Sequence, residues 1–259
     1  MQDLVVTIIQ ADLAWEDKAK NLSRFEAKLE ALTNLSDVVI LPEMFSNGFT
    51  MNARQLAETA DGPGVQWLQK MAALYDVDLV GSLIIREQDK FFNRLFWAKP
   101  DGALFWYDKR HLFRMAGEQE VYSAGAERIT VGLKGWKIRP LICYDLRFPV
   151  WSRNQGGNDY DLLVYIANWP TRRSLHWTTL LSARAIENQA YVVGVNRVGK
   201  DGNGIEHSGD SMVIDPAGQI LAHLRGREGV HTQRLSRQML DNYREKFPAW
   251  KDGDRFKIL

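Results

Sequence analysis

The segment Arg139-Pro-Leu-Ile-Cys-Tyr-Asp-Leu-Arg-Phe-Pro149 contains the single cysteine of this 259-residue chain. The apolar pair Leu141 and Ile142 is typical of the end of a buried strand, and Pro149 suits the first turn of a helix. Cys143 is therefore predicted to lie at a strand-to-helix turn, where α/β enzymes place a nucleophile near backbone N–H groups. A free cysteine is more commonly a small buried apolar residue, so this segment alone leaves both interpretations open.

The charge and hydropathy of the chain exclude several classes of partner. Basic and acidic residues nearly balance, 33 against 32, and the formal net charge is +1. This balance provides no basic surface for nucleic acid or for a membrane, so neither is expected as a partner. No window approaches the ~20 apolar residues of a membrane span, and Val5–Ile9 has the length of a strand rather than of a secretory signal. A single cysteine excludes an internal disulfide and fits a reducing cytoplasm.

The order of apolar patterns along the chain predicts an α/β fold. Helical spacing predicts helices over residues 22–32, 65–75, 175–189 and 236–247. Strands are predicted at 4–9, 37–41, 79–85, 91–98, 104–107, 129–131, 136–142, 161–166, 191–195, 211–214, 220–224 and 230–235. Strand–helix–strand units at both ends flank hairpins, and no linker interrupts them. We expect two mixed sheets packed face to face, with helices outside, in one domain spanning residues 1–259.

Three polar residues each follow an apolar strand, where α/β folds place their sites. They are Glu43, Lys109 and Cys143. A thiolate that attacks a carbonyl needs a base and a donor for the oxyanion, and a carboxylate and an ammonium would supply both. Glu43 or Lys109 alone would be an ordinary surface residue at a strand end. The occurrence of all three together favours a catalytic site with a cysteine nucleophile.

Three motifs carry a resemblance to a known superfamily. They are Leu41-Pro-Glu-Met-Phe45, Tyr107-Asp-Lys-Arg-His-Leu-Phe113 and Ile142-Cys-Tyr-Asp-Leu-Arg-Phe-Pro149. In this order and spacing they resemble the motifs of the nitrilase, or carbon–nitrogen hydrolase, superfamily, and within it those of the omega-amidases. The resemblance covers essentially the whole chain. It implies a four-layer α-β-β-α sandwich and hydrolysis of an amide or nitrile through a thioester, without a cofactor or a metal ion.

The same resemblance implies a role for each matching residue. Glu43 resembles the general base that deprotonates Cys143 and later activates water. Lys109 resembles the cation that stabilises the tetrahedral intermediate, together with the backbone N–H of Tyr144. Many members have a second carboxylate before a conserved segment that reads Ser123-Ala-Gly125 here.

The spacing from that segment points to Glu118 as the second carboxylate. An alanine stands where other members have a proline, so Glu120 remains a rival for the same place.

Residues after the strand at 161–166 are candidates for substrate binding. Asn168 either contacts the substrate or simply shapes the turn at the end of the strand. Arg172 and Arg173 precede a predicted helix, and a guanidinium there could hold a substrate carboxylate through two parallel hydrogen bonds. Asp145 and Arg147 are expected to orient the cysteine turn.

The leading hypothesis is an omega-amidase acting on a small ω-amide of a dicarboxylate, of the 2-oxoglutaramate type, in a homodimer. A nitrilase or another aliphatic amidase would use the same residues. A metal-dependent phosphoesterase is the alternative of another mechanism, because Glu43, Asn168, Asp210 and His207 are residue types of such sites. That alternative, like a non-enzymatic binding protein, gives Cys143 and Lys109 no necessary role.

Overall fold

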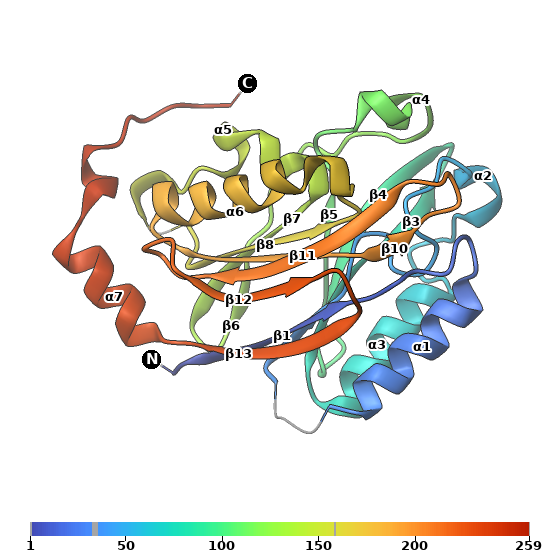
Figure 1. Ribbon diagram of the computed structural model, residues 1–259, viewed down its shortest axis with the longest axis horizontal. Helices are drawn as coiled ribbons and strands as arrows, with labels where there is room; N and C mark the ends of the chain where they lie inside the picture. The colour runs from blue at the N-terminus through green and yellow to red at the C-terminus, as the bar shows by residue number, and fades with distance from the viewer. Residues whose placement is uncertain (1, 33–35, 158, 259) are drawn as a thin grey trace.

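A computed structural model describes residues 2–32, 36–157 and 159–258 and shows two mixed sheets packed face to face (Figure 1). The strands of the first sheet are, in order, β13 (Gly229–Leu235), β1 (Leu4–Gln10), β2 (Val38–Ile40), β3 (Asp78–Glu87), β4 (Lys90–Ala98) and β5 (Leu104–Asp108). Those of the second are β10 (Val198–Lys200), β11 (Glu206–Ile214), β9 (Tyr191–Asn196), β8 (Leu162–Ala167), β7 (Trp136–Ile142) and β6 (Val131–Leu133), with β12 (Ile220–Arg225) paired to β11.

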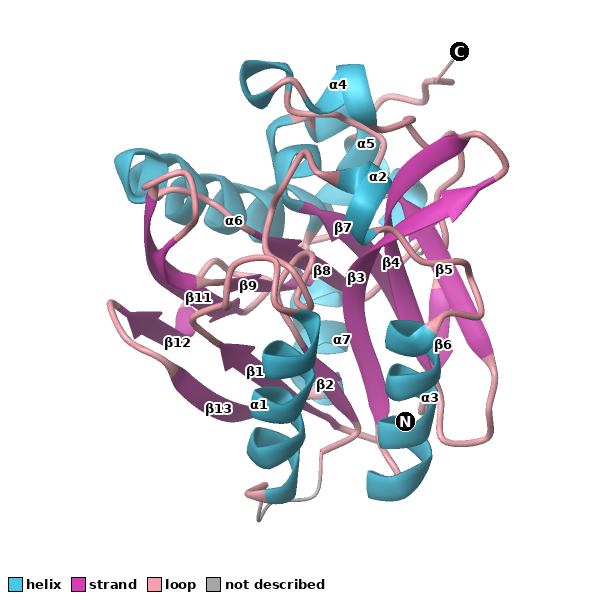
Figure 2. Cartoon of the chain, turned by 90° about the vertical axis from the view of Figure 1, so that its right-hand side faces the viewer, coloured by secondary structure: helices cyan, strands magenta, loops and turns pink. Residues whose placement is uncertain are grey.

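Helices cover the outer face of each sheet, so the predicted four-layer α-β-β-α sandwich is confirmed (Figure 2). The helices α1 (Lys18–Glu30) and α3 (Pro63–Tyr75) lie against the first sheet, and α5 (Pro149–Ser152) and α6 (Ser174–Asn188) lie by the second. Two short helices, α2 (Ala53–Leu56) and α4 (Glu118–Val121), lie in loops, and α7 (Arg237–Lys246) follows β13. Within the described residues, every helix is too short or too polar to cross a bilayer.

Local sequence explains where α1, α3 and α7 begin. Asp17 caps α1 by accepting a hydrogen bond from the Lys20 N–H at 3.0 Å, and Ser236 caps α7 through the Met239 N–H at 3.2 Å. Pro63 occupies the first turn of α3, where its missing N–H costs nothing.

The structure adds elements that the sequence patterns did not predict. The polar stretch 109–126, for which no helix or strand was predicted, contains α4 and a 3₁₀ turn at Arg114–Ala116. Strand β11 begins at Glu206 rather than at residue 211. Polar and glycine residues at 208–210 obscure the apolar alternation of that strand, and the left-handed backbone of Asp210 interrupts it at φ 59°.

The carboxyl ends of strands from both sheets meet at one side of the sandwich. In the second sheet β7, β8 and β9 run parallel, with Ile142 opposite Ile166. In the first sheet β1, β2 and β3 run parallel. The segments that follow β2, β5, β7 and β8 therefore supply the side chains of one site.

One glycine sets the position of the segment after β2. A Cβ added to Gly81 on β3 would lie 2.6 Å from Cδ1 of Phe45 and 3.3 Å from Cβ of Leu41. Both residues flank Glu43 and are completely buried, so the ring of Phe45 has little space into which it can move. The absence of a side chain at Gly81 lets the segment 41–45 pack directly on the sheet.

We therefore predict that Gly81→Ala lowers the free energy of unfolding by about 1–3 kcal/mol, the usual cost of overpacking a core. Because Glu43 lies in the displaced segment, kcat for the protein's reaction should fall as well. The matched control is Gly132→Ala in β6, whose added Cβ would meet nothing within 4 Å. Urea denaturation of both variants measures the effect, and equal stability of Gly81→Ala and wild type would contradict this packing argument.

Candidate active site

Cys143 lies at the sharp turn that follows β7. A 3₁₀ turn at Cys143–Arg147 begins directly after Ile142, and α5 follows it. Cys143 has φ 44°, a left-handed conformation that is strained for a residue with a side chain. The strained turn leaves the half-buried thiol on the pocket surface, as in other nucleophile turns of α/β enzymes.

Asp145 fixes this turn against the segment that carries Lys109. Its Oδ2 accepts hydrogen bonds from the Ile142 N–H at 3.0 Å and the Tyr107 hydroxyl at 2.7 Å. Its Oδ1 accepts the His111 N–H at 3.0 Å. The carboxylate is completely buried, so it links the nucleophile turn to the end of β5 through short hydrogen bonds, as the sequence interpretation of Asp145 expected.

Lys109 lies between two carboxylates in the interior. Its Nζ is 2.8 Å from Oε1 of Glu43 and 3.0 Å from Oε1 of Glu118. Lys109 exposes 1% of its surface and both glutamates expose none. The ring of Phe49 lies 4.9 Å from Nζ and covers the ammonium. An ammonium at this depth is stable only because both carboxylates compensate it.

Four donors converge on Glu43 and hold its carboxylate in one orientation. Oε1 accepts Nζ of Lys109 and Nδ2 of Asn93, both at 2.8 Å. Oε2 accepts the backbone N–H of Asn168 at 2.8 Å, and Nδ2 of Asn168 donates to the backbone carbonyl of Glu43 at 2.6 Å. Met44, the next residue, has φ 45°. A second strained turn thus presents Glu43 beside Cys143.

The surroundings shift the proton affinities of the cluster. Burial raises the pKa of the Cys143 thiol well above its usual range, and the nearby charge of Glu43 adds to the rise, whereas Lys109 opposes it. Burial alone would lower the pKa of Lys109, but Glu118 and Glu43 outweigh it and raise that pKa. Burial also raises the pKa of Glu118 above the ordinary value although Lys109 opposes this rise. The resting site therefore holds a protonated thiol beside a charged ammonium.

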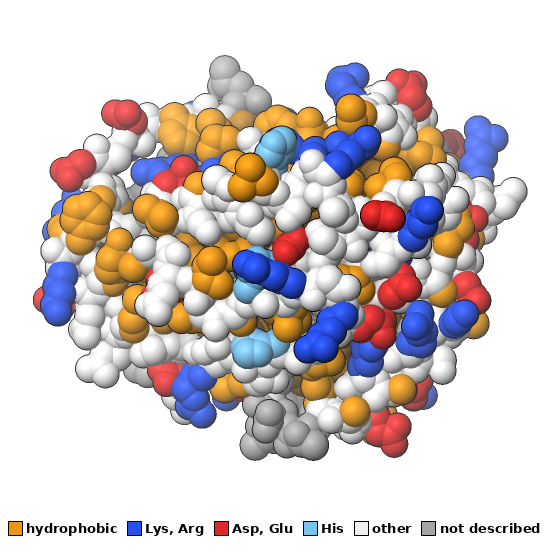
Figure 3. Space-filling view, viewed as in Figure 1, with side chains coloured by type: hydrophobic (Ala, Val, Ile, Leu, Met, Phe, Trp, Pro, Cys, Tyr) orange, Lys and Arg blue, Asp and Glu red, His pale blue; other side chains and the backbone are white. Residues whose placement is uncertain are grey.

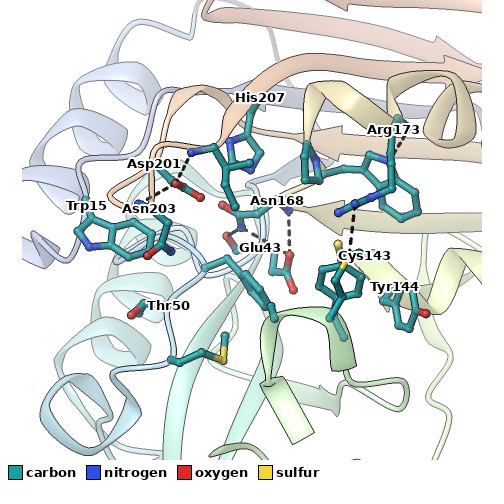
Figure 4. A pocket seen from close by; sticks show the side chains of 18 of the residues that line it. Trp15, Glu43, Thr50, Cys143, Tyr144, Asn168, Arg173, Asp201, Asn203 and His207 are labelled. Carbon is teal, nitrogen blue, oxygen red and sulfur yellow. Dashed lines mark hydrogen bonds between the residues drawn. The ribbon is translucent and has the colours of Figure 1, made fainter.

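The cluster opens into a cavity of about 510 Å³ that extends to both sides of Cys143 (Figure 4). Glu43 and Asn168 lie near its middle, and Cys143 lies toward the side of Tyr144 and Arg173. The opposite side is lined by Trp15, Thr50, Asp201 and Asn203. Partly apolar walls and a few converging polar groups are typical of a site for a small molecule.

Three arginines, Arg147, Arg172 and Arg173, line this cavity. Arg147 lies 4.9 Å from the ring of Trp169 and Arg173 lies 5.1 Å from the ring of Phe113. Burial and the two neighbouring guanidinium groups lower the pKa of Arg173. In the described part of the chain none of the three forms a salt bridge, although Nη2 of Arg147 lies 2.9 Å from Nδ1 of His176. Their charges therefore stand beside the cavity without a paired carboxylate.

The structure brings most of the predicted site residues to one place. Glu118, not Glu120, contacts Lys109, and Glu120 is exposed. Arg147, expected to orient the turn, also lines the cavity from the end of the 3₁₀ turn. The sequence analysis did not identify Asn93 as a partner of Glu43. The pattern of a strand does not distinguish this residue from any other polar residue of β4.

The four residues suggested for a phosphoesterase are not assembled. Glu43, Asn168 and His207 line the cavity, but Asp210 does not. It accepts a hydrogen bond from Ser174 at 2.7 Å at the start of α6 and pairs with His223 at 3.0 Å.

Comparison with known proteins agrees with this geometry. The carbon–nitrogen hydrolase family matches residues 5–245. The chain is 49% identical over 259 residues to omega-amidase YafV of Escherichia coli K12, covering 100% of both chains. It is 34% identical to 2-oxoglutaramate amidase of Bacillus subtilis, over 95% of this chain and 96% of the relative.

Among solved structures, a carbon–nitrogen hydrolase superfamily protein from Xanthomonas campestris, which carries an arsenic adduct in its active site, superposes with a TM-score of 0.98. That protein is 47% identical, with 100% of both chains covered. The chain belongs to the carbon–nitrogen hydrolase family, and the resemblance seen in its three motifs is confirmed.

The raised pKa of Cys143 predicts an unusual pH dependence of thiol labelling. Because alkylation requires the thiolate, the rate of labelling by iodoacetamide should keep rising through pH 9, about tenfold per pH unit. The same protein in denaturant should level off near the ordinary thiol pKa of ~8.5. The rates are read by mass spectrometry of this single cysteine, and a plateau at or below pH 7 in the folded protein would show a preformed thiolate instead.

Proposed function

We propose that this protein is an omega-amidase, which hydrolyses a small ω-amide of a dicarboxylate, of the 2-oxoglutaramate type, to the acid and ammonia. The observation that carries this proposal is the buried Lys109, shared by Glu43 and Glu118, beside a cysteine on the surface of the cavity. The relatives named omega-amidase and 2-oxoglutaramate amidase support the same substrate class.

In the proposed acylation step, Glu43 takes the proton of Cys143 as Sγ attacks the amide carbon. This order suits a thiol whose pKa is raised, because the base acts only during attack. Nζ of Lys109 and the backbone N–H of Tyr144 donate to the developing oxyanion. Glu43 then returns the proton to the nitrogen, the C–N bond breaks, and ammonia leaves a thioester on Cys143.

In the proposed deacylation step, Glu43 accepts a proton from a water molecule that attacks the thioester carbon. The C–S bond breaks, Cys143 recovers its proton, and the dicarboxylate leaves. Glu118, as the second carboxylate that contacts Nζ, holds the ammonium of Lys109 in place together with Glu43. The whole cycle consumes one amide and one water, and it uses no group that the chain itself does not provide.

We also propose that the arginine group at one side of the cavity binds the free carboxylate of the substrate. Arg173 and Arg147 are half-buried and Arg172 is exposed, so desolvation strengthens the attraction of the first two for an anion. Two parallel hydrogen bonds from a guanidinium would fix the amide carbon against Cys143.

The test is ammonia release from a panel of ω-amide acids and from the same amides with the free carboxylate esterified. Wild type should hydrolyse the acids with the higher kcat/KM, and Cys143→Ala should release no ammonia. Cys143→Ser should be nearly as inactive, because a hydroxyl is a weak nucleophile without a dedicated histidine base. Turnover by Cys143→Ala would contradict the thioester mechanism.

The arginine variants serve as controls for the same assay. Arg173→Ala and Arg147→Ala should lose most of the preference for the free acid, and Arg172→Ala should lose less. Equal hydrolysis of acid and ester by wild type would contradict carboxylate recognition, and an unchanged preference in all three variants would place it elsewhere.

We further propose a cytoplasmic homodimer that associates through α5 and α6. A reducing compartment would keep Cys143 as a thiol. Val150 of α5 and Leu175 and Ile186 of α6 expose 53%, 74% and 52% of their surface, and apolar side chains gather along the upper part of the face in Figure 3.

Light scattering tests the assembly. Wild type should have twice the mass of one 29.7 kDa chain, and a variant with both Leu175→Asp and Ile186→Asp should have the mass of one chain. A monomeric wild type would contradict the dimer.

A further inference from the structure

Trp169 contacts two of the three arginines that line the cavity. Its indole Nε1 donates a hydrogen bond to the backbone carbonyl of Arg173 at 2.7 Å. The guanidinium of Arg147 lies over the indole ring, 4.9 Å from its centre. Trp169 exposes 3% of its surface and itself lines the cavity. The N–H and the ring face of one side chain therefore contact different arginines.

The surroundings of Trp169 leave its indole little freedom. Its backbone N–H donates to Oδ1 of Asn196 at 2.7 Å, and Nδ2 of Asn196 donates to its carbonyl at 3.0 Å. Asn196 is the last residue of β9. The indole packs against the ring of Trp177 on α6, with 5.4 Å between the centres, and Trp177 is completely buried. Trp169 is thus a rigid support between the second sheet and the segment that carries Arg173.

The turn that carries Arg173 starts α6 without a side-chain cap among the described residues. Arg173 is the last residue of the 3₁₀ turn Thr171–Arg173 and directly precedes Ser174, where α6 begins. Its backbone N–H donates to the carbonyl of Pro170 at 2.9 Å, which closes the turn but does not tie it to the rest of the fold. The hydrogen bond from Trp169 supplies that connection.

The guanidinium of Arg173 keeps its donors for a ligand. Among the described residues it donates only to Sδ of Met115, at 3.8 Å, and a thioether is a weak acceptor. The ring of Phe113 lies 5.1 Å from the guanidinium and uses none of its N–H groups. A carboxylate could therefore accept two N–H groups of Arg173 without displacing a strong partner.

Arg173 is better placed than Arg147 to bind a carboxylate beside the thiol. Nη2 of Arg147 already lies 2.9 Å from Nδ1 of His176. Arg173 interacts electrostatically with Cys143, and Figure 4 shows its side chain on the same side of the cavity as the thiol. The arginine whose backbone Trp169 holds is therefore also the one with donors to spare.

We propose that Trp169 is a positioning residue for substrate specificity: its indole N–H holds Arg173 where the guanidinium binds the free carboxylate of the substrate. This inference rests on the proposed carboxylate recognition and specifies which arginine carries it. A bidentate pair depends on the place and the angle of the guanidinium. A misplaced carboxylate no longer holds the amide carbon against Cys143, so loss of the hydrogen bond should impair the free acid more than a substrate whose carboxylate is blocked.

The experiment measures ammonia release from an ω-amide acid and from the same amide with its free carboxylate esterified. The ratio of the two kcat/KM values is the acid preference. Trp169→Phe removes Nε1 and keeps an aromatic face beside Arg147. We expect this variant to lower the acid preference about fivefold to tenfold, the effect of losing one hydrogen bond of ordinary strength.

Trp177→Phe is the matched control. It removes another buried indole N–H, which donates to the carbonyl of Asp210 at 2.8 Å, at a position that does not line the cavity. The acid preference should stay at the wild-type value in this variant even if both rates fall, because a ratio does not depend on the folded fraction of a sample. An unchanged acid preference in Trp169→Phe, or an equal loss in Trp177→Phe, would overturn the proposal.

A double-mutant cycle identifies the arginine through which Trp169 acts. Trp169→Phe should not lower the acid preference further in an Arg173→Ala background, whereas it should still lower it in an Arg147→Ala background. A loss in the Arg173→Ala background as large as that in wild type would contradict the proposal, because Trp169 would then act without Arg173.

Binding of glutarate, a dicarboxylate without an amide, tests the positioning role without turnover. Calorimetry should give a Kd about fivefold to tenfold higher in Trp169→Phe than in wild type or Trp177→Phe. If wild type shows this pattern but releases no ammonia from any ω-amide, the proposed function is wrong and the positioning role holds. If wild type prefers the free acid of an ω-amide and Trp169→Phe changes neither that preference nor the Kd, only the positioning role is wrong.

Discussion

The whole site depends on one buried cation shared by two buried carboxylates. Lys109 lies within 3.0 Å of both Glu43 and Glu118, and removing one partner from such a cluster would leave an uncompensated charge in the interior, at a typical cost of 3–5 kcal/mol. The desolvation that makes the cluster costly also strengthens its action on a substrate. Burial raises the pKa of the Cys143 thiol, so in the proposed mechanism Glu43 accepts its proton only during attack.

The fold supplies this cluster from separate strand ends and fixes them with strained turns. Met44, which directly follows Glu43, adopts a left-handed backbone conformation, and so does Cys143 itself. Such strain persists only where the surroundings determine it. Here Asp145 fixes the cysteine turn through hydrogen bonds from Tyr107, His111 and Ile142. The missing side chain of Gly81 lets Phe45, and with it the segment of Glu43, pack directly on the sheet.

Much of the fold and the main site residues could be predicted from the sequence, because both follow from local patterns. Apolar runs predict the strands, and Glu43, Lys109 and Cys143 directly follow such runs. The choice between Glu118 and Glu120 needed the phase of the short helix α4, which turns only Glu118 inward. Predicting that Asn93 contacts Glu43 would have required the pairing of β4 with its neighbours. Predicting that Arg147 lines the cavity would have required the course of the 3₁₀ turn. No local pattern encodes those two features.

The most direct test of this account is the substitution Lys109→Met, which keeps a long side chain and removes the cation. We expect kcat for an ω-amide acid to fall by at least ~10²–10³, the usual effect of losing one oxyanion donor. The free energy of unfolding should also fall, because Glu43 and Glu118 would face each other without the ammonium. A Lys109→Met variant that kept wild-type kcat would contradict the central claim that the shared cation stabilises the reaction at Cys143.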